Sequence, residues 1–156
     1  MKMDTSIGAN ARHEVAQALL PVLADTYVLY LKTHAFHWNV VGPRFAELHK
    51  LFEEQYNALW TVTDDIAERI RSLGEFAPAS GGDMIKSASL KEATEAKKPD
   101  MEMVKELVEG HEAIIKTIHK AHETAEKSGD EVTVDLMVQR LAYHEKTAWM
   151  LRAHLG

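Results

Sequence analysis

Cysteine is absent from the 156-residue sequence, and its absence excludes disulfide bonds, thiolate metal ligands and cysteine nucleophiles. Long apolar runs are also missing. No stretch of about 18 consecutive apolar residues occurs, so no membrane-spanning helix is predicted. The segment up to Glu14 lacks the apolar centre of a signal peptide. We therefore expect a cytoplasmic protein that has no membrane partner.

Positive charge is scarce relative to negative charge. The chain has 18 Lys and Arg against 24 Asp and Glu, for a formal net charge of −6. This balance argues against a generally basic nucleic-acid surface and is compatible with attracting cations. Residues 1–8 are expected to form a flexible tail. Through Glu14, Lys2 and Arg12 are offset by Asp4 and Glu14, so this end carries no basic cluster.

Strand patterns are absent, and apolar residues recur instead at helical spacing. Long helices are predicted over residues 9–37, 44–73, 100–127 and 130–154, and a short one over 84–88. Gly42-Pro43, Gly74 and Ser128-Gly129 supply the breaks, and Pro21 is expected to kink or loosen the first helix. The connection of some 25 residues after Gly74 is long for a compact domain. This length suggests that it crosses from one end of a bundle to the other. The fold class is therefore all-α: a ferritin-like four-helix bundle over residues 9–156, with a short helix in the crossover between its second and third long helices.

A row of metal-type side chains follows the second predicted helix, beside its apolar face. His49 and Glu53 form one i,i+4 pair, and Asp64 and Glu68 form another. His37 ends the preceding helix, close to the Gly42-Pro43 turn. Imidazole together with carboxylate suits Fe(II), Zn(II) or Mn(II). These five residues are the candidate metal ligands.

The spacing of the two pairs constrains how they can be used. His49 and Asp64 are fifteen residues apart, roughly 22 Å along a helix, whereas a ligand atom lies only about 2–2.6 Å from its metal ion. One chain therefore cannot place both on one ion. Either two half-sites exist, or two antiparallel copies bring His37 and His49 of one chain against Asp64 and Glu68 of the other. Two-fold interfaces are the commonest in homo-oligomers.

Plainer readings exist for each residue. His37 alone is more often a core or capping histidine, and each i,i+4 pair alone could be a solvated helix face. A di-iron centre inside one bundle usually needs Glu-x-x-His on two helices, and no Glu here is followed three residues later by His. Four other histidines are interpreted as structural or surface residues: His111, His119, His122 and His144. Trp38 and Trp60 are expected to pack across an interface.

The stretches YVLYLKTHAFHWNVVGPRF, LHKLFEEQY and DDIAERIRSLG resemble the Dps family of mini-ferritins. The resemblance is strong over residues 20–74 and extends elsewhere through helix order. It implies twelve ferritin-like subunits in a hollow shell, with ferroxidase centres at two-fold interfaces. By this resemblance His37 and His49 are the ligands from one subunit, and Asp64 and Glu68 are the ligands from its partner.

Three further assignments follow from the resemblance. Glu53 stands where the family often has Asp, as an additional ligand with a longer arm. Glu53 and Glu54 are expected to help nucleate mineral. Asp130 and Asp135 match the region that lines acidic iron-entry pores, where carboxylates would concentrate Fe(II).

The implied chemistry is the oxidation of Fe(II) to Fe(III) and storage of a ferric mineral, which protects against oxidative damage. Hydrogen peroxide is the preferred oxidant and dioxygen the alternative. Two irons per site are possible, and Zn(II) could substitute. Unlike DNA-condensing members, this chain has no Lys/Arg-rich tail, so DNA binding is expected to be absent or weak. The alternative is a DNA-coating or structural shell whose metal site is not catalytic.

Overall fold

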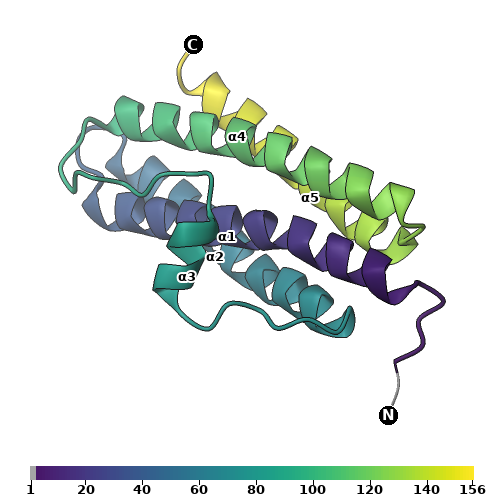
Figure 1. The fold of residues 1–156 in the computed structure, drawn as a ribbon. Coiled ribbons are helices and arrows are strands. Elements are labelled where there is room, and N and C mark those ends of the chain that lie inside the picture. Colours follow the sequence, from purple (N-terminus) through teal and green to yellow (C-terminus); the bar gives the residue numbers. More distant parts are fainter. Residues whose placement is uncertain (1–2) are drawn as a thin grey trace.

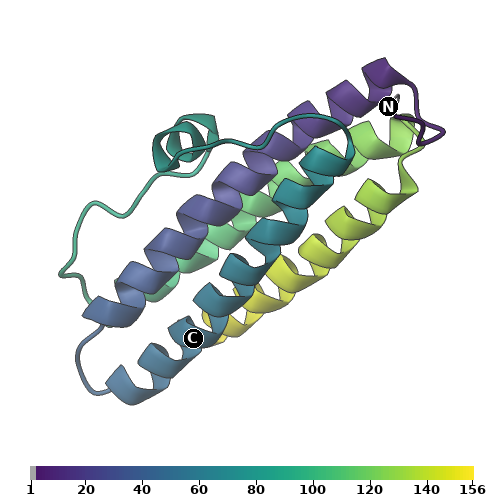
Figure 2. The ribbon, with the colours of Figure 1, turned by 90° about the horizontal axis from the view of Figure 1, so that it is seen from below.

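The computed structural model describes residues 3–156, and all the regular structure within that range is helical. The four long helices are α1 (Ala9–Asn39), α2 (Phe45–Ser72), α4 (Asp100–Lys127) and α5 (Glu131–Ala153). A short helix, α3 (Gly81–Ser87), lies in the crossover and packs against α1, outside the bundle (Figures 1 and 2). The predicted ferritin-like bundle with one long connection is confirmed.

The bundle consists of two helical hairpins. α1 packs along α2, α4 packs along α5, and α1 also packs on α4 (Figure 2). Leucine, isoleucine, valine, phenylalanine and methionine side chains from all four long helices form one continuous core. Close approach of α1 and α4 depends on Gly110, because a Cβ atom there would lie 2.7 Å from Cδ1 of Leu29. The core therefore lies along the whole bundle axis and fixes the helix faces that point outward.

α1 is buried over a wide arc, as its two apolar stripes predict. It runs without a break through Pro21. By length and composition alone α1 could cross a membrane, although its apolar residues do not form the long uninterrupted run that a membrane span was expected to need. However, 56% of the residues in that window are buried within the protein. The apolar character of α1 is explained by its central place in the bundle.

The turn between α1 and α2 positions the candidate ligands. Gly42 has a φ of +115°, a conformation that disfavours residues with a Cβ atom. Arg44 then donates two hydrogen bonds to the Asp100 carboxylate, at 3.0 and 2.9 Å, and so fixes the turn to the start of α4. The end of α1 and the first turns of α2 are thereby held side by side.

A buried carboxylate holds the crossover on the bundle. Asp25 of α1 is fully buried and accepts hydrogen bonds from the Ser89 backbone, the Ser89 hydroxyl, the Leu90 backbone and the Thr117 hydroxyl. The short helix begins earlier than the predicted residue 84, because the Ser80 hydroxyl caps it by accepting a hydrogen bond from the Asp83 backbone at 3.1 Å. The crossover is therefore ordered by specific polar contacts.

Candidate metal site

His37 and His49 are held by each other's backbone. Nδ1 of His37 lies 2.7 Å from the carbonyl oxygen of His49, and Nδ1 of His49 lies 2.8 Å from the carbonyl oxygen of His37. Their rings stack with centroids 3.8 Å apart and planes 19° apart. The α1–α2 turn makes this reciprocal arrangement possible. Two residues twelve positions apart in sequence therefore form one rigid unit.

These two contacts determine which nitrogen of each ring is free. A carbonyl oxygen can only accept, so Nδ1 of each ring must carry the hydrogen. Nε2 of each neutral imidazole then keeps its lone pair, which is the form that binds a metal ion. Metal-ligating histidines are commonly oriented in this way by a carbonyl or carboxylate on the second nitrogen. The local geometry thus fixes two imidazole rings whose Nε2 lone pairs are free to bind a metal ion.

Aromatic rings surround the histidine unit. Phe45 stacks on His49 with centroids 4.9 Å apart, and Tyr56 meets the edge of His37 at 5.2 Å. Tyr56 also stacks on His34 at 3.8 Å. Burial, and secondarily the neighbouring His37, lower the pKa of His34. These contacts restrict the rotation of the rings, and the lowered pKa of His34 favours its neutral form.

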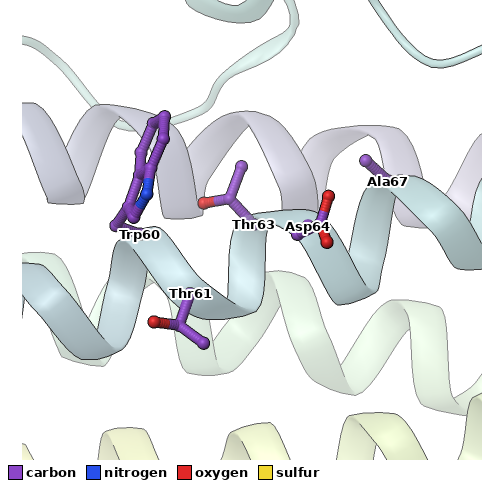
Figure 3. Close-up of a pocket in the computed structure, with 5 residues that line it drawn as sticks. All are labelled: Trp60, Thr61, Thr63, Asp64 and Ala67. Carbon is purple, nitrogen blue, oxygen red and sulfur yellow. The ribbon is translucent and has the colours of Figure 1, made fainter.

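The carboxylate pair lies farther along α2 and is exposed. Asp64 lines a shallow pocket of about 510 Å³ together with Trp60 and Ala67, and the Trp60 and Asp64 side chains project from α2 one turn apart (Figure 3). Glu68 lines a second pocket, between α2 and α5. Trp60 is 58% exposed and Trp38 is 64% exposed. Large apolar rings therefore border the ligand row on the surface of the protomer.

Glu53 and Glu54 lie one turn beyond His49 on α2, and both are exposed. Glu53 is the i,i+4 neighbour of His49, which places it beside the histidine unit. Within residues 3–156, neither carboxylate forms a hydrogen bond or an ion pair. Both are therefore available for cations.

No single protomer completes the site. Among residues 3–156, no three His, Asp or Glu side chains lie close enough together to hold one metal ion. α2 is continuous from Phe45 to Ser72, so the helical separation of His49 from Asp64 is retained. The structure thus brings His37 and His49 together and keeps Asp64 and Glu68 apart from them. This arrangement is compatible with both alternatives that the spacing left open: two separate half-sites, or ligands shared between two chains.

The two acids at the start of α5 differ in accessibility. Asp130 is 1% exposed; it caps the helix, accepts hydrogen bonds from the Thr133 backbone and hydroxyl, and pairs with Arg69 at 2.7 Å. Burial raises the pKa of the Asp130 carboxyl, but the hydrogen bonds from Arg69 and Thr133 outweigh this and leave it below its ordinary value. Asp135 is exposed. A pore role for this region stays a prediction, and Asp135 is the acid whose carboxylate faces solvent.

Comparison with known proteins agrees with this architecture. A model of the ferritin-like domain matches residues 16–156. The DNA protection during starvation protein of Helicobacter pylori J99 is 40% identical over 133 residues, covering 85% of this chain and 92% of that protein. The chain belongs to the Dps family.

Solved Dps structures superpose on the whole bundle. The Dps protein of Bacillus brevis gives a TM-score of 0.90 at 37% identity, covering 99% of this chain and 100% of that one. The Dps protein of Vibrio cholerae O1 gives 0.93 at 33% identity, covering 100% and 98%. The latter is described as a member of a broad superfamily of ferritin-like diiron-carboxylate proteins. Family membership is thus supported by both sequence and fold.

Proposed function

We propose that this Dps protein is a mini-ferritin that oxidises Fe(II) at sites shared between two-fold related subunits and stores the product as a ferric mineral. The observation that carries the proposal is the reciprocal bonding of His37 and His49, which leaves the Nε2 lone pair of each stacked ring free for a metal ion. The complementary carboxylates, Asp64 and Glu68, are exposed on the same helix and too distant to join them within one chain. A second chain supplies what the first lacks.

Iron is the substrate in this scheme. His37 and His49 of one subunit bind Fe(II) together with Asp64 and Glu68 of the partner, and Glu53 contributes from the histidine-bearing chain. Two ferrous ions each give one electron to hydrogen peroxide, the O–O bond breaks, and two protons complete two water molecules. This two-electron route avoids releasing hydroxyl radical. The carboxylates neutralise the growing positive charge as Fe(III) forms; dioxygen is the alternative oxidant, and Zn(II) competes for the same donors.

The assembly that fits this chemistry is a dodecameric shell in the cytoplasm. Exposed Trp38 and Trp60 flank the ligand row and would be covered by the two-fold partner. Asp135 would face an entry pore, and Glu53 with Glu54 would face the growing mineral. Each of these placements concentrates Fe(II) along a path lined by carboxylates.

Complementation between two inactive variants tests the shared site. His49→Ala and Asp64→Ala are each expected to abolish rapid oxidation. In a mixed two-fold pair, one site loses both ligands and the other keeps all of them. Random co-assembly of co-expressed chains should therefore restore about a quarter of the wild-type sites. The readout is ferric absorbance after anaerobic Fe(II) loading and peroxide addition, with assembly checked by light scattering.

The control is co-assembly of His37→Ala with His49→Ala, which lie on the same chain's half of the site. Every site in that mixture lacks one imidazole, so no recovery is expected. Absence of recovery in the first mixture, with intact mixed shells, would contradict a site shared between subunits. Equal oxidation by wild type and Asp64→Ala would mean that the carboxylate row is structural.

A DNA-coating shell is the second candidate, and the name of the Helicobacter pylori relative favours testing it. The net charge of −6 and the balanced N-terminal segment oppose it. Gel-shift assays at low and moderate salt separate the two functions. We expect no retarded DNA at moderate salt, whereas stable retardation by the Asp64→Ala shell would favour the coating role.

A further inference from the structure

A second histidine pair lies in the centre of the bundle. His111 of α4 and His144 of α5 are fully buried, and their Nδ1 atoms lie 2.8 Å apart. At this distance one Nδ1 must carry a hydrogen and donate, while the other must keep a lone pair and accept. The hydrogen bond therefore exists only while one of the two Nδ1 atoms carries no hydrogen.

The surroundings offer no partner for a positive charge on this pair. Nε2 of each ring is buried and has no hydrogen-bond partner among residues 3–156. On α5, the Tyr143 ring packs against both imidazoles and the Arg140 guanidinium lies near His144. α2 contributes the buried, uncharged Gln55 near Tyr143. Of these groups on α5, Arg140 adds positive charge and Tyr143 is a neutral phenol. Neither can therefore compensate a positive charge on the histidine pair.

The buried acid of α1 does not compensate either. Asp25 is occupied by Ser89, Leu90 and Thr117. Within the described chain, no hydrogen bond or ion pair joins any carboxylate to either imidazole. A proton added to the pair would remain an uncompensated charge in an apolar core, where burial disfavours the charged form.

We infer that the His111–His144 pair is an acid-sensitive switch that loosens the packing of α4 against α5 in mildly acidic medium. Protonation of the accepting Nδ1 would set two N–H donors face to face where one hydrogen bond had been. It would also bury a charge with no counter-ion. Both effects favour separation of the two helices and entry of water.

The direction of the pH dependence follows from burial. Burial lowers the pKa of His111 to about 3, and burial, then His111 and Arg140, lower the pKa of His144 well below its ordinary value. A base whose pKa is depressed in the folded state binds protons preferentially when the structure opens. Destabilisation by the pair is therefore negligible above about pH 7, begins near the ordinary histidine pKa of about 6.5, and grows until the folded-state pKa is reached.

This switch is separate from the proposed ferroxidase site. The candidate ligands lie on α1 and α2, whereas the buried pair joins α4 to α5. Its test accordingly reads the stability of segments rather than oxidation of iron, and it stands even if the proposed function fails.

Hydrogen exchange of the full-length, iron-free protein in the presence of a chelator tests the switch at pH 7 and pH 5, after correction for intrinsic exchange rates. From His111 alone, opening of residues 107–115 and 140–148 is expected to become roughly 25-fold more favourable at pH 5. The double variant His111→Gln/His144→Gln keeps an amide hydrogen bond without a titrating ring. Its pH-dependent opening is expected to be largely abolished.

The matched control is His119→Gln/His122→Gln, which removes two histidines from the solvent-facing side of the same helix. Its exchange should respond to pH as wild type does. An equal acid response in wild type and the His111→Gln/His144→Gln variant would overturn the inference. If that variant does not assemble, the exchange of the wild-type protein decides. Opening of residues 107–115 and 140–148 that is no more favourable at pH 5 than at pH 7 would then overturn the inference. Acid-induced exchange confined to residues 34–53 would assign the response to the surface histidines and contradict the switch.

Discussion

The two histidine pairs of this protein use the same ring in opposite ways. His37 and His49 each place Nδ1 on a backbone carbonyl, which leaves Nε2 free at the edge of α1 and α2. His111 and His144 place Nδ1 on each other, and their Nε2 atoms are sealed in the core. In the proposed function the first pair receives a cation, whereas the second can receive only a proton, and that at a cost in stability. What the second ring nitrogen contacts decides whether a histidine is a ligand or a structural residue.

Removing a surface imidazole should give the largest effect on chemistry. His49→Ala removes one ligand and the ring that stacks on His37, although the backbone carbonyl at position 49 still accepts the hydrogen bond from His37. Loss of an outer-shell partner alone typically costs 10–100-fold in metal affinity or activity, so we expect peroxide-driven Fe(II) oxidation to fall by more than about 100-fold. Stopped-flow ferric absorbance measures the rate.

The free energy of unfolding should hardly change in His49→Ala, because the His49 ring is partly exposed and water can replace its hydrogen bond to the His37 carbonyl. A large fall in the thermal midpoint, together with the lost oxidation, would mean that the pair is primarily structural. His154→Ala, at the C-terminal end of α5, is a control in which oxidation is expected to persist.

Removing a buried imidazole should reverse this pattern. His144→Ala leaves His111 Nδ1 without a partner and creates a cavity between α4 and α5, so we expect a loss of about 2–3 kcal/mol in stability at pH 7. Oxidation at 20 °C should be within about twofold of wild type because no candidate ligand lies on α4 or α5. Denaturant unfolding and stopped-flow oxidation together check both halves of the prediction. Loss of oxidation in intact shells would contradict the separation of the two pairs.

The contrast between the pairs marks where prediction from sequence ends. Helix order and the ligand row follow from spacing along single helices, because a 3.6-residue period fixes which residues share a face. The incompleteness of the site within one chain follows from the same geometry. His111 and His144 lie on or near apolar stripes, which predicted a structural or surface role, and the structure buries both in the core. Their direct hydrogen bond depends on how two helices align, which periodicity does not determine.

Contacts that join distant segments were likewise beyond sequence reasoning. The reciprocal bonds of His37 and His49 depend on the exact path of the turn at Gly42. Asp25 meets the crossover 64 residues later, and Asp130 meets Arg69 across 61 residues. Asp130 was assigned to a pore by the family resemblance, and that assignment stays a prediction. Its side chain caps α5 and pairs with Arg69 of α2, contacts that only the packing of the two helices reveals.

A smaller effect is expected from the capping acid at the start of α5. Asp130→Asn keeps an acceptor for the Thr133 backbone but removes the charge that pairs with Arg69, so we expect a loss of about 1 kcal/mol at pH 7. Because the pKa of Asp130 is lowered in the folded protein, its stabilisation is present above the ordinary pKa and is lost as the pH falls through the folded value.

Denaturant unfolding at pH 7 and near pH 3 checks this dependence. The difference between wild type and Asp130→Asn should shrink at the lower pH. A constant difference would contradict the ion pair as its source. Asp135→Asn, in the same helix but exposed, should leave stability unchanged and serves as the matched control.

The smallest effects are expected for two adjacent exposed carboxylates of α2, one turn beyond His49. Glu53 is the i,i+4 neighbour of His49, and Glu54 is rotated by one residue around α2. Glu53→Gln is expected to slow Fe(II) oxidation by about three- to tenfold, since an auxiliary carboxylate tunes charge but two imidazoles and two partner carboxylates remain. Glu54→Gln should leave the initial oxidation rate unchanged and slow only the later growth of ferric absorbance at high iron loading. Rates measured at two irons per site and at several hundred irons per shell separate the two steps. Equal slowing of the initial rate in both variants would mean that the two carboxylates act as one diffuse negative patch, and that Glu53 is not a ligand.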